Sequence, residues 1–324
     1  MYKIDETNAK ILKDLLRDGR KDFADIAKEC NATKNTIWRR YTKMKEAGII
    51  VGATNQMNYA SFGYDVIATI LLNIESHQVE DTFERIKKTL NLLPIRQFNS
   101  RYNIRVIANL RNLKELDRIK ETIRLHSSVT DLRTYFWLDV KNNPENLSFQ
   151  SLELRRENVG EENLKIISPQ KKITTDDIDK RIAQKLADNG RMSFRKIAEE
   201  IGMSTDTVIR RYERLVKSGA MKVSIQINPE KLGYQANLDF SIAFAFHKET
   251  APIVEKLSKI PGVIIIIKTS GDYDLHVTAM VRDSIQQFEI QEEIAKIPNI
   301  AKMETAARRI PNKWPTNSQH ISTF

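Results

Sequence analysis

One stretch of this sequence is written twice: residues 5–64 return, altered but in register, at residues 176–234. Ten residues recur at one constant offset, namely Gly19, Arg20, Phe23, Ile26, Ala27, Thr36, Arg39, Arg40, Tyr41 and Gly48, which return as Gly190, Arg191, Phe194, Ile197, Ala198, Thr207, Arg210, Arg211, Tyr212 and Gly219. A period this long is not that of a solenoid. Since 324 residues also exceed what one ordinary core needs, the duplication predicts a two-domain module that occurs twice.

Apolar residues at helical spacing predict three short helices in the first copy, over residues 4–18, 22–30 and 33–47. Asp5 is the expected N-cap of the first helix, and Gly19 is expected to end it.

The second copy has capping and turn residues at equivalent positions. Ser193 and Ser204 are the expected caps of its second and third helices, and Gly202 marks the turn between them. Three short helices with such a turn are typical of a helix-turn-helix unit. The alternating stretches that follow, residues 49–58 and 220–228, predict a strand or a wing.

The third helix of such a unit lies in the major groove of DNA, with its N-terminal side chains on base edges. Residues 34–45 carry five basic and no acidic side chains, as expected of a helix flanked by phosphates, whereas Asp206 and Glu213 offset part of the charge in the second copy. The residues predicted to bind DNA are Lys34, Asn35, Thr36, Trp38, Arg39, Arg40 and Lys43 in the first copy and Thr205, Thr207, Arg210, Arg211 and Arg214 in the second.

Several of these residues have a competing structural interpretation. A basic helix face can simply be solvated. Arg40 and Arg211 lie at the edge of the face expected to be buried, so an ion pair with an acid of the first helix competes with a phosphate contact. Trp38 is expected to pack against the following strand rather than contact a base, and Asp206 to interact with the helix dipole.

After each helical unit the pattern becomes strand, helix, strand, strand, helix, strand. The expected elements are 66–74, 79–90, 94–99, 103–110, 113–125 and 129–140 in the first half and 238–246, 251–260, 263–269, 273–280, 284–297 and 300–310 in the second. This is the order of a ferredoxin-like split βαβ fold. Because such a sheet has helices on one face only, its other face needs a partner sheet. The predicted class is α+β, with two helix-turn-helix (winged-helix-like) and two ferredoxin-like βαββαβ domains in tandem.

Two segments closely resemble the Lrp/AsnC, or feast/famine, family of transcription regulators. They are the third helix Val208–Leu215 leading to Gly219, and the sheet turn Thr269–Leu275. The resemblance covers nearly all of the chain except the linker and the tail. It implies DNA binding by the helical domains, dimerisation of the ferredoxin-like domains sheet to sheet, and in many members binding of an amino acid or similar small effector near that turn.

The two halves differ at this turn. The second reads Ser270-Gly271-Asp272-Tyr273-Asp274, whereas the first reads Asn99-Ser100-Arg101-Tyr102-Asn103 and lacks the glycine, which adopts the positive φ of a tight turn at no steric cost. An effector pocket is therefore expected only in the second half, at Gly271, Asp272, Tyr273 and Asp274, with a purely structural hairpin as the alternative.

The expected domains are helix-turn-helix at 1–60 and 173–232, ferredoxin-like at 61–140 and 233–311, a linker at 141–172 and a tail at 312–324. One chain with two modules can supply both halves of a family-type dimer, so we expect an intrachain pseudo-dimer; a homodimer of whole chains is the competing arrangement. Since Trp38 corresponds to Ile209 and Lys43 to Arg214, a pseudo-dimer should prefer an asymmetric operator.

Composition sets the remaining limits. The net charge of +10 favours an anionic partner such as double-stranded DNA. Cys30 is the only cysteine, and neither a signal peptide nor a membrane-spanning run is expected, which suggests a cytoplasmic protein.

Catalysis is not expected. Some relatives with this domain plan decarboxylate a tetrapyrrole of the sirohaem type, so that activity is the alternative function. It would require histidine and arginine around a carboxylated substrate, yet the five histidines share no motif. No catalytic residue, cofactor or metal site is predicted.

Overall fold

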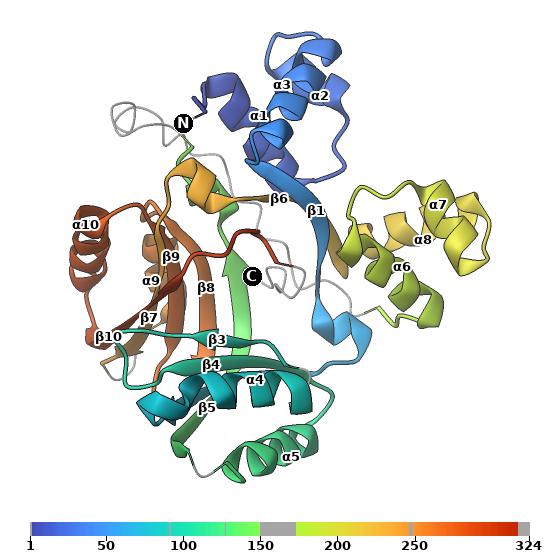
Figure 1. Ribbon diagram of the computed structural model, residues 1–324. Coiled ribbons are helices and arrows are strands. Elements are labelled where there is room, and N and C mark those ends of the chain that lie inside the picture. The colour runs from blue at the N-terminus through green and yellow to red at the C-terminus, as the bar shows by residue number, and fades with distance from the viewer. Residues whose placement is uncertain (1, 91, 127, 150–172, 246–248, 317–324) are drawn as a thin grey trace. The chain divides into compact units, whose positions relative to one another are not determined.

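The computed structural model describes residues 2–90, 92–126, 128–149, 173–245 and 249–316 of the chain (Figure 1). They form two compact units: a helical unit of Met1–Phe62, Leu147–Tyr234 and Pro311–Phe324, and a sheet unit of Gly63–Asn146 and Gln235–Ile310. Each unit combines the same domain from both copies of the repeat. The α+β class expected from the sequence is confirmed.

The helical unit contains two sets of three helices, each followed by a strand. They are α1 (Glu6–Arg17), α2 (Phe23–Glu29), α3 (Lys34–Glu46) and β1 (Ile50–Met57), then α6 (Asp177–Asp188), α7 (Phe194–Ile201), α8 (Thr205–Lys217) and β6 (Met221–Ile227). The expected caps are confirmed: Asp5 accepts the N–H of Asn8 at 2.8 Å, and Ser204 accepts that of Thr207 at 3.2 Å. Gly202 ends α7 with φ +69°, as the expected turn requires.

The two strands that follow the helices pair with each other. β1 and β6 form an antiparallel two-stranded ribbon, and each helical domain packs on the strand of the other copy, α1 on β6 and α6 on β1. Equivalent hydroxyls fix this exchange, since Ser224 donates to the carbonyl of Leu16 at 2.9 Å and Thr54 donates to that of Ala187 at 2.8 Å. The helical domains are therefore interlocked through backbone and side-chain bonds.

Two of the four repeated glycines, Gly19 and Gly190, have a different role from the one expected. α1 ends with Asp18 as its C-cap, so Gly19 is not the residue that ends it. The backbone of Gly19 instead approaches β6, where its N–H donates to Val223 at 2.8 Å and an added Cβ would lie 2.7 Å from the carbonyl carbon of Ser224. Gly190 lies against β1 in the same way. Only glycine fits these two close approaches.

The repeated arginines also cross between the copies. The guanidinium of Arg20 lies over the ring of Phe194, 4.1 Å from its centroid, and donates to the carbonyl of Gly190 at 2.8 Å. Arg191 lies over Phe23 in return, at 5.0 Å. Such cation–π contacts strengthen when they are partly desolvated. The reciprocal pairs give the helical unit an approximate two-fold symmetry.

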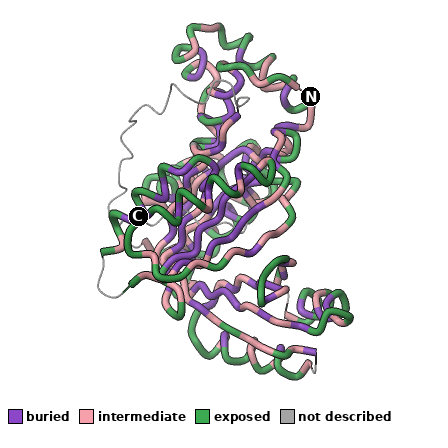
Figure 2. The backbone as a smooth tube through the Cα atoms, turned by 90° about the vertical axis from the view of Figure 1, so that its left-hand side faces the viewer, coloured by how far each residue is buried: buried purple, intermediate pink, exposed green. Residues whose placement is uncertain are grey.

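The sheet unit is one antiparallel sheet of eight strands with four helices on one face. Its elements are β2 (Val66–Ile74), α4 (Val79–Leu90), β3 (Pro94–Arg96), β4 (Ile104–Leu110), α5 (Leu113–Arg124) and β5 (Val129–Asn142), then β7 (Ala236–Phe244), α9 (Thr250–Ser258), β8 (Val263–Ser270), β9 (Leu275–Val281), α10 (Ser284–Ala295) and β10 (Ile300–Arg309). The strand order is β10-β7-β9-β8-β5-β2-β4-β3, so each half has the ferredoxin-like order. Figure 2 shows that its strands are mostly buried and that the helices are exposed on their outer side.

The halves join edge to edge, β5 to β8, where the sequence suggested two sheets stacked face to face. At the two remaining edges Phe98 and Ala307 exchange backbone hydrogen bonds of 2.7 and 2.9 Å. The sheet thus closes on itself and covers the face that lacks helices. Closure satisfies the need for a partner sheet and leaves few free edges.

A charged cluster lies on the enclosed face. Arg105 on β4 reaches Asp239 on β7 at 3.4 Å, five strands away in the sheet, and Arg308 binds the same carboxylate at 2.7 Å. Burial by itself would raise the pKa of Asp239, but Arg308 and Arg105 lower it to about 2. His276 stacks on Tyr135 beside them, with ring centroids 3.9 Å apart.

The connector and the tail differ in extent from the prediction. β5 continues to Asn142 and a short 3-10 turn follows at Pro144–Asn146, so the first part of the expected linker belongs to the sheet unit. Residues 150–172 of that linker lie outside the described residues. Trp314 of the tail pairs with Ile227 at the end of β6. Among the described residues, no helix is long and apolar enough to cross a membrane.

Replacing Gly19 by Ala should destabilise the helical unit by about 2 kcal/mol or more, because the new methyl group meets backbone that cannot rotate away. Denaturant unfolding followed by circular dichroism measures this. Gly52→Ala is the matched control, since its Cβ meets only the flexible side chain of Gln226 at 3.0 Å. Equal losses in the two variants would contradict the proposed role of Gly19.

Acid should destabilise the sheet unit through His276. Burial and the neighbouring Arg105 lower the pKa of His276 from 6.5 to about 3, so the unfolded chain binds a proton that the folded chain refuses between these values. The free energy of unfolding should therefore fall by about 1–3 kcal/mol from pH 7 to pH 4.

Measuring unfolding across this pH range with His276→Gln tests the assignment, because glutamine does not titrate and should flatten the dependence. The exposed His77 provides the control variant, His77→Gln, which should keep the slope of the unsubstituted protein.

Candidate DNA-binding surface

The third helix of the first copy, α3, presents a bare basic face. Its Ile37 and Met44 are buried against α1 and α2, which turns the other face outward. Six of the predicted DNA-binding residues are exposed there: Lys34, Asn35, Thr36, Trp38, Arg39 and Lys43. Thr33 caps the helix by accepting the N–H of Thr36 at 3.1 Å, so the first turn is fixed at the end where bases would be read.

Trp38 is 53% exposed on the same face as Arg39, so about half of this residue is open to solvent. Its expected packing against the following strand stays a prediction. The ring is large, flat and free to stack on or wedge against another molecule.

Some basic side chains of α3 form ion pairs with carboxylates of the same copy, and others do not pair with any described residue. Lys34 pairs with Asp22 at 3.1 Å, and Arg40 pairs with Asp5 at 2.6 Å. Arg39 and Lys43 have no hydrogen-bond or ion-pair partner within the described part of the chain. The structural interpretation of Arg40 thus holds in the structure, while Arg39 and Lys43 project as free charges.

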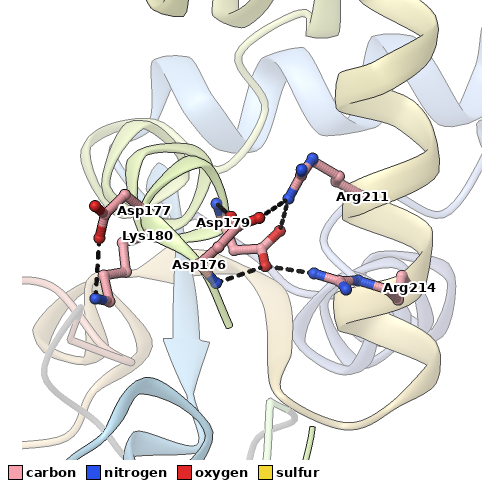
Figure 3. Close-up of polar contacts among 6 residues, drawn as sticks. All are labelled: Asp176, Asp177, Asp179, Lys180, Arg211 and Arg214. Atoms are coloured by element: carbon pink, nitrogen blue, oxygen red, sulfur yellow. Dashed lines mark hydrogen bonds and ion pairs between the residues drawn. The ribbon is translucent and has the colours of Figure 1, made fainter. Parts of the chain in front are cut away.

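The third helix of the second copy, α8, differs. Arg210 is exposed, whereas Thr205 and Thr207 are half-buried. Arg211 donates to Asp176 at 2.7 Å and to Asp179 at 3.0 Å, and Arg214 also binds Asp179, as Figure 3 shows.

The carboxylates that hold these arginines were not among the predicted site residues. Asp176 and Asp179 form a capping box at the start of α6, which satisfies the backbone N–H groups there. Hydrogen bonds from the N–H of Asp179 and from Arg211 lower the pKa of Asp176, and Asp176 in turn raises the pKa of Arg211. The spacing of two aspartates three residues apart before an apolar run was the available sequence signal.

The predicted effector residues build a hairpin. Gly271 has φ +130° and is exposed, so it supplies the turn. Asp272 binds Arg133 of the first half at 2.5 Å, and Asp274 accepts the N–H of Phe244 at 2.7 Å. Tyr273 is half-buried and lies 5.0 Å from the ammonium of Lys302.

A polar cavity of about 520 Å³ lies at the corresponding turn of the first half. Among its lining residues are Glu75, Arg96, Asn99 and Asn103. Asn99 adopts φ +55°, and Asn103 exchanges hydrogen bonds of 3.0 and 2.6 Å with the backbone of Ile74. The sequence placed an effector pocket of the family type only in the second half, and that expectation stays a prediction.

The fold and this surface define a protein with two helix-turn-helix domains and two ferredoxin-like domains in one chain. An AsnC-type helix-turn-helix domain matches residues 176–216, and a winged helix-turn-helix DNA-binding domain matches residues 4–51. An uncharacterized HTH-type transcriptional regulator of Pyrococcus horikoshii is 35% identical over 147 residues, which are 44% of this chain and 92% of that protein. A similar regulator of Pyrococcus abyssi is 33% identical over 151 residues, 46% of this chain and 94% of that protein.

The chain belongs to the Lrp/AsnC family of transcription regulators. Each of these relatives aligns with less than half of it, which fits a chain that carries the family's module twice. Among solved structures, the siroheme decarboxylase NirDL superposes with a TM-score of 0.64 over 99% of this chain and 94% of that chain, at 15% sequence identity. At that identity the likeness concerns the fold alone.

Proposed function

We propose that this protein is a sequence-specific transcription regulator that binds double-stranded DNA in the cytoplasm. The observation that carries the proposal is the exposed face of α3, on which Arg39 and Lys43, beside Trp38, have no partner among the described residues. Free cations on the exposed face of a recognition helix provide phosphate contacts and readout of guanine edges.

We further propose that one chain acts as a pseudo-dimer. The exchanged ribbon already pairs the two helical domains within the chain. On the enclosed face of the sheet, Thr69 occupies in the first half the register of Asp239 in the second. A sheet made of two first halves would therefore bury two copies of Arg105 with no carboxylate between them, which is costly. This difference favours pairing of unlike halves.

A tetrapyrrole decarboxylase on the same fold is the competing function. It needs a residue that can protonate its substrate near neutral pH. His276 is enclosed in the sheet beside Arg105, and its pKa of about 3 makes it a poor proton donor. No group of three or more potential metal ligands occurs among the residues that the structure describes. An absorbance change of a bound tetrapyrrole during incubation would favour the enzyme.

The proposal includes a response to an amino acid or similar small effector at the turn of Gly271–Asp274. Asp272 and Asp274 offer carboxylates to a ligand's ammonium group, in competition with Arg133 and the N–H of Phe244. Gly271→Val should abolish any change of DNA affinity that amino acids cause, because valine does not tolerate this φ. A retained response would move the site elsewhere, with the cavity at Asn99–Asn103 as the next candidate.

Arg39→Ala and Lys43→Ala should weaken DNA binding by roughly 1–3 kcal/mol where a base edge is read and less for a phosphate contact. Fluorescence anisotropy with operator DNA, repeated over a salt series, measures this. Lys88→Ala on α4 is the charge-matched control, because this exposed lysine belongs to the sheet unit. If all three variants bind like the unsubstituted protein, α3 does not contact DNA.

The operator should be asymmetric, because the reading faces of α3 and α8 carry different side chains, as Trp38 and Ile209 illustrate. Selection from a random-sequence library, followed by sequencing of the bound pool, provides the test. Recovery of perfect inverted repeats would contradict reading by two unlike helices in one chain.

A further inference from the structure

The two copies differ at one buried position behind the recognition helix. Asp5 and Asp176 occupy the same place at the start of α1 and α6, as do Arg40 and Arg211 on the third helices. Three residues after the shared aspartate, however, the first copy has Asn8 and the second has Asp179. Asn8 is 3% exposed, and the side chain of Asp179 is 0% exposed.

This difference between asparagine and aspartate changes which basic side chains of the third helix are paired. In the first copy the Asn8 Oδ1 accepts a hydrogen bond from Arg40 at 3.1 Å, and Lys43 has no partner in the part of the chain that the structure describes. In the second copy both carboxylate oxygens of Asp179 are used, one by Arg211 and the other by Arg214, the counterpart of Lys43 (Figure 3).

Releasing Arg214 toward DNA would be costly. The carboxylate of Asp179 would keep Arg211 and the N–H of Asp176, at 3.0 and 3.1 Å, but would lose its second cation while remaining buried. A buried carboxylate that loses a paired cation is destabilised far more than an exposed one. The neutral amide of Asn8 imposes no such cost on Lys43.

We propose that Asp179 is a positioning residue that restrains Arg214 from DNA, so that the two recognition helices contribute unequally to binding. The first helix provides the dominant electrostatic contact with its half-site. The second reads its half-site mainly through Arg210, with Arg214 held against α6. This inference rests on the proposed function, since it concerns how much α3 and α8 each contribute to the affinity for DNA.

The reciprocal substitutions Asp179→Asn and Asn8→Asp test the inference in the full-length protein. Asp179→Asn should free Arg214, raise affinity for operator DNA roughly tenfold and steepen the slope of log K against log salt by about 1. Asn8→Asp should capture Lys43 and shift both quantities the other way. Anisotropy titrations at four or more salt concentrations give both readouts.

The double variant Asp179→Asn/Arg214→Ala is the control, because removing the freed arginine should cancel the gain. Circular dichroism and thermal unfolding establish that each variant is folded. If Asp179→Asn does not fold, Asn8→Asp decides alone, and an unchanged salt slope in it overturns the inference. A folded Asp179→Asn with the slope of the unsubstituted protein also overturns it. Absence of DNA binding by the unsubstituted protein would instead refute the proposed function.

Discussion

Backbone exchange between the two copies organises the helical unit. The N–H of Gly19 donates to β6 and that of Gly190 donates to β1, each at a distance that leaves no room for a side chain. Arg20 and Arg191 then cross the same junction to stack on rings of the opposite copy. Because the first helix of each copy packs on the strand of the other, part of the apolar face of each helical domain is buried by the opposite copy.

Much of this architecture could be predicted from local patterns, because caps, turns and apolar periodicity act over a few residues. The limits of α4 and β2 were predicted to the residue, and the caps Asp5 and Ser204 were identified correctly. Partners distant in sequence were not predictable in this way. The repeated Gly-Arg pair by which the duplication was recognised forms the contact between the copies. From the sequence alone, however, its glycine looks like the end of a helix.

The candidate site shows the same division. Helical geometry correctly turned Arg39 and Lys43 outward, since rotation per residue is fixed. It could not reveal that Arg214, on an equivalent face, is held by a residue of another helix. Trp38 was assigned to packing because aromatic rings usually bury their area, and only the structure shows that about half of this residue stays exposed. At the corresponding turn of the first half, which lacks the glycine, Asn99 adopts the positive φ instead, because asparagine also reaches this region.

Two of the differences between the repeats lie at buried polar positions. Thr69 against Asp239 changes the enclosed face of the sheet, and Asn8 against Asp179 changes the charge behind the recognition helix. Joining both halves in one polypeptide also makes ribbon formation unimolecular, so it is insensitive to dilution. Occupancy of a DNA target would then depend linearly on protein concentration even when the protein is very dilute. Separate subunits would have to dimerise before they could bind.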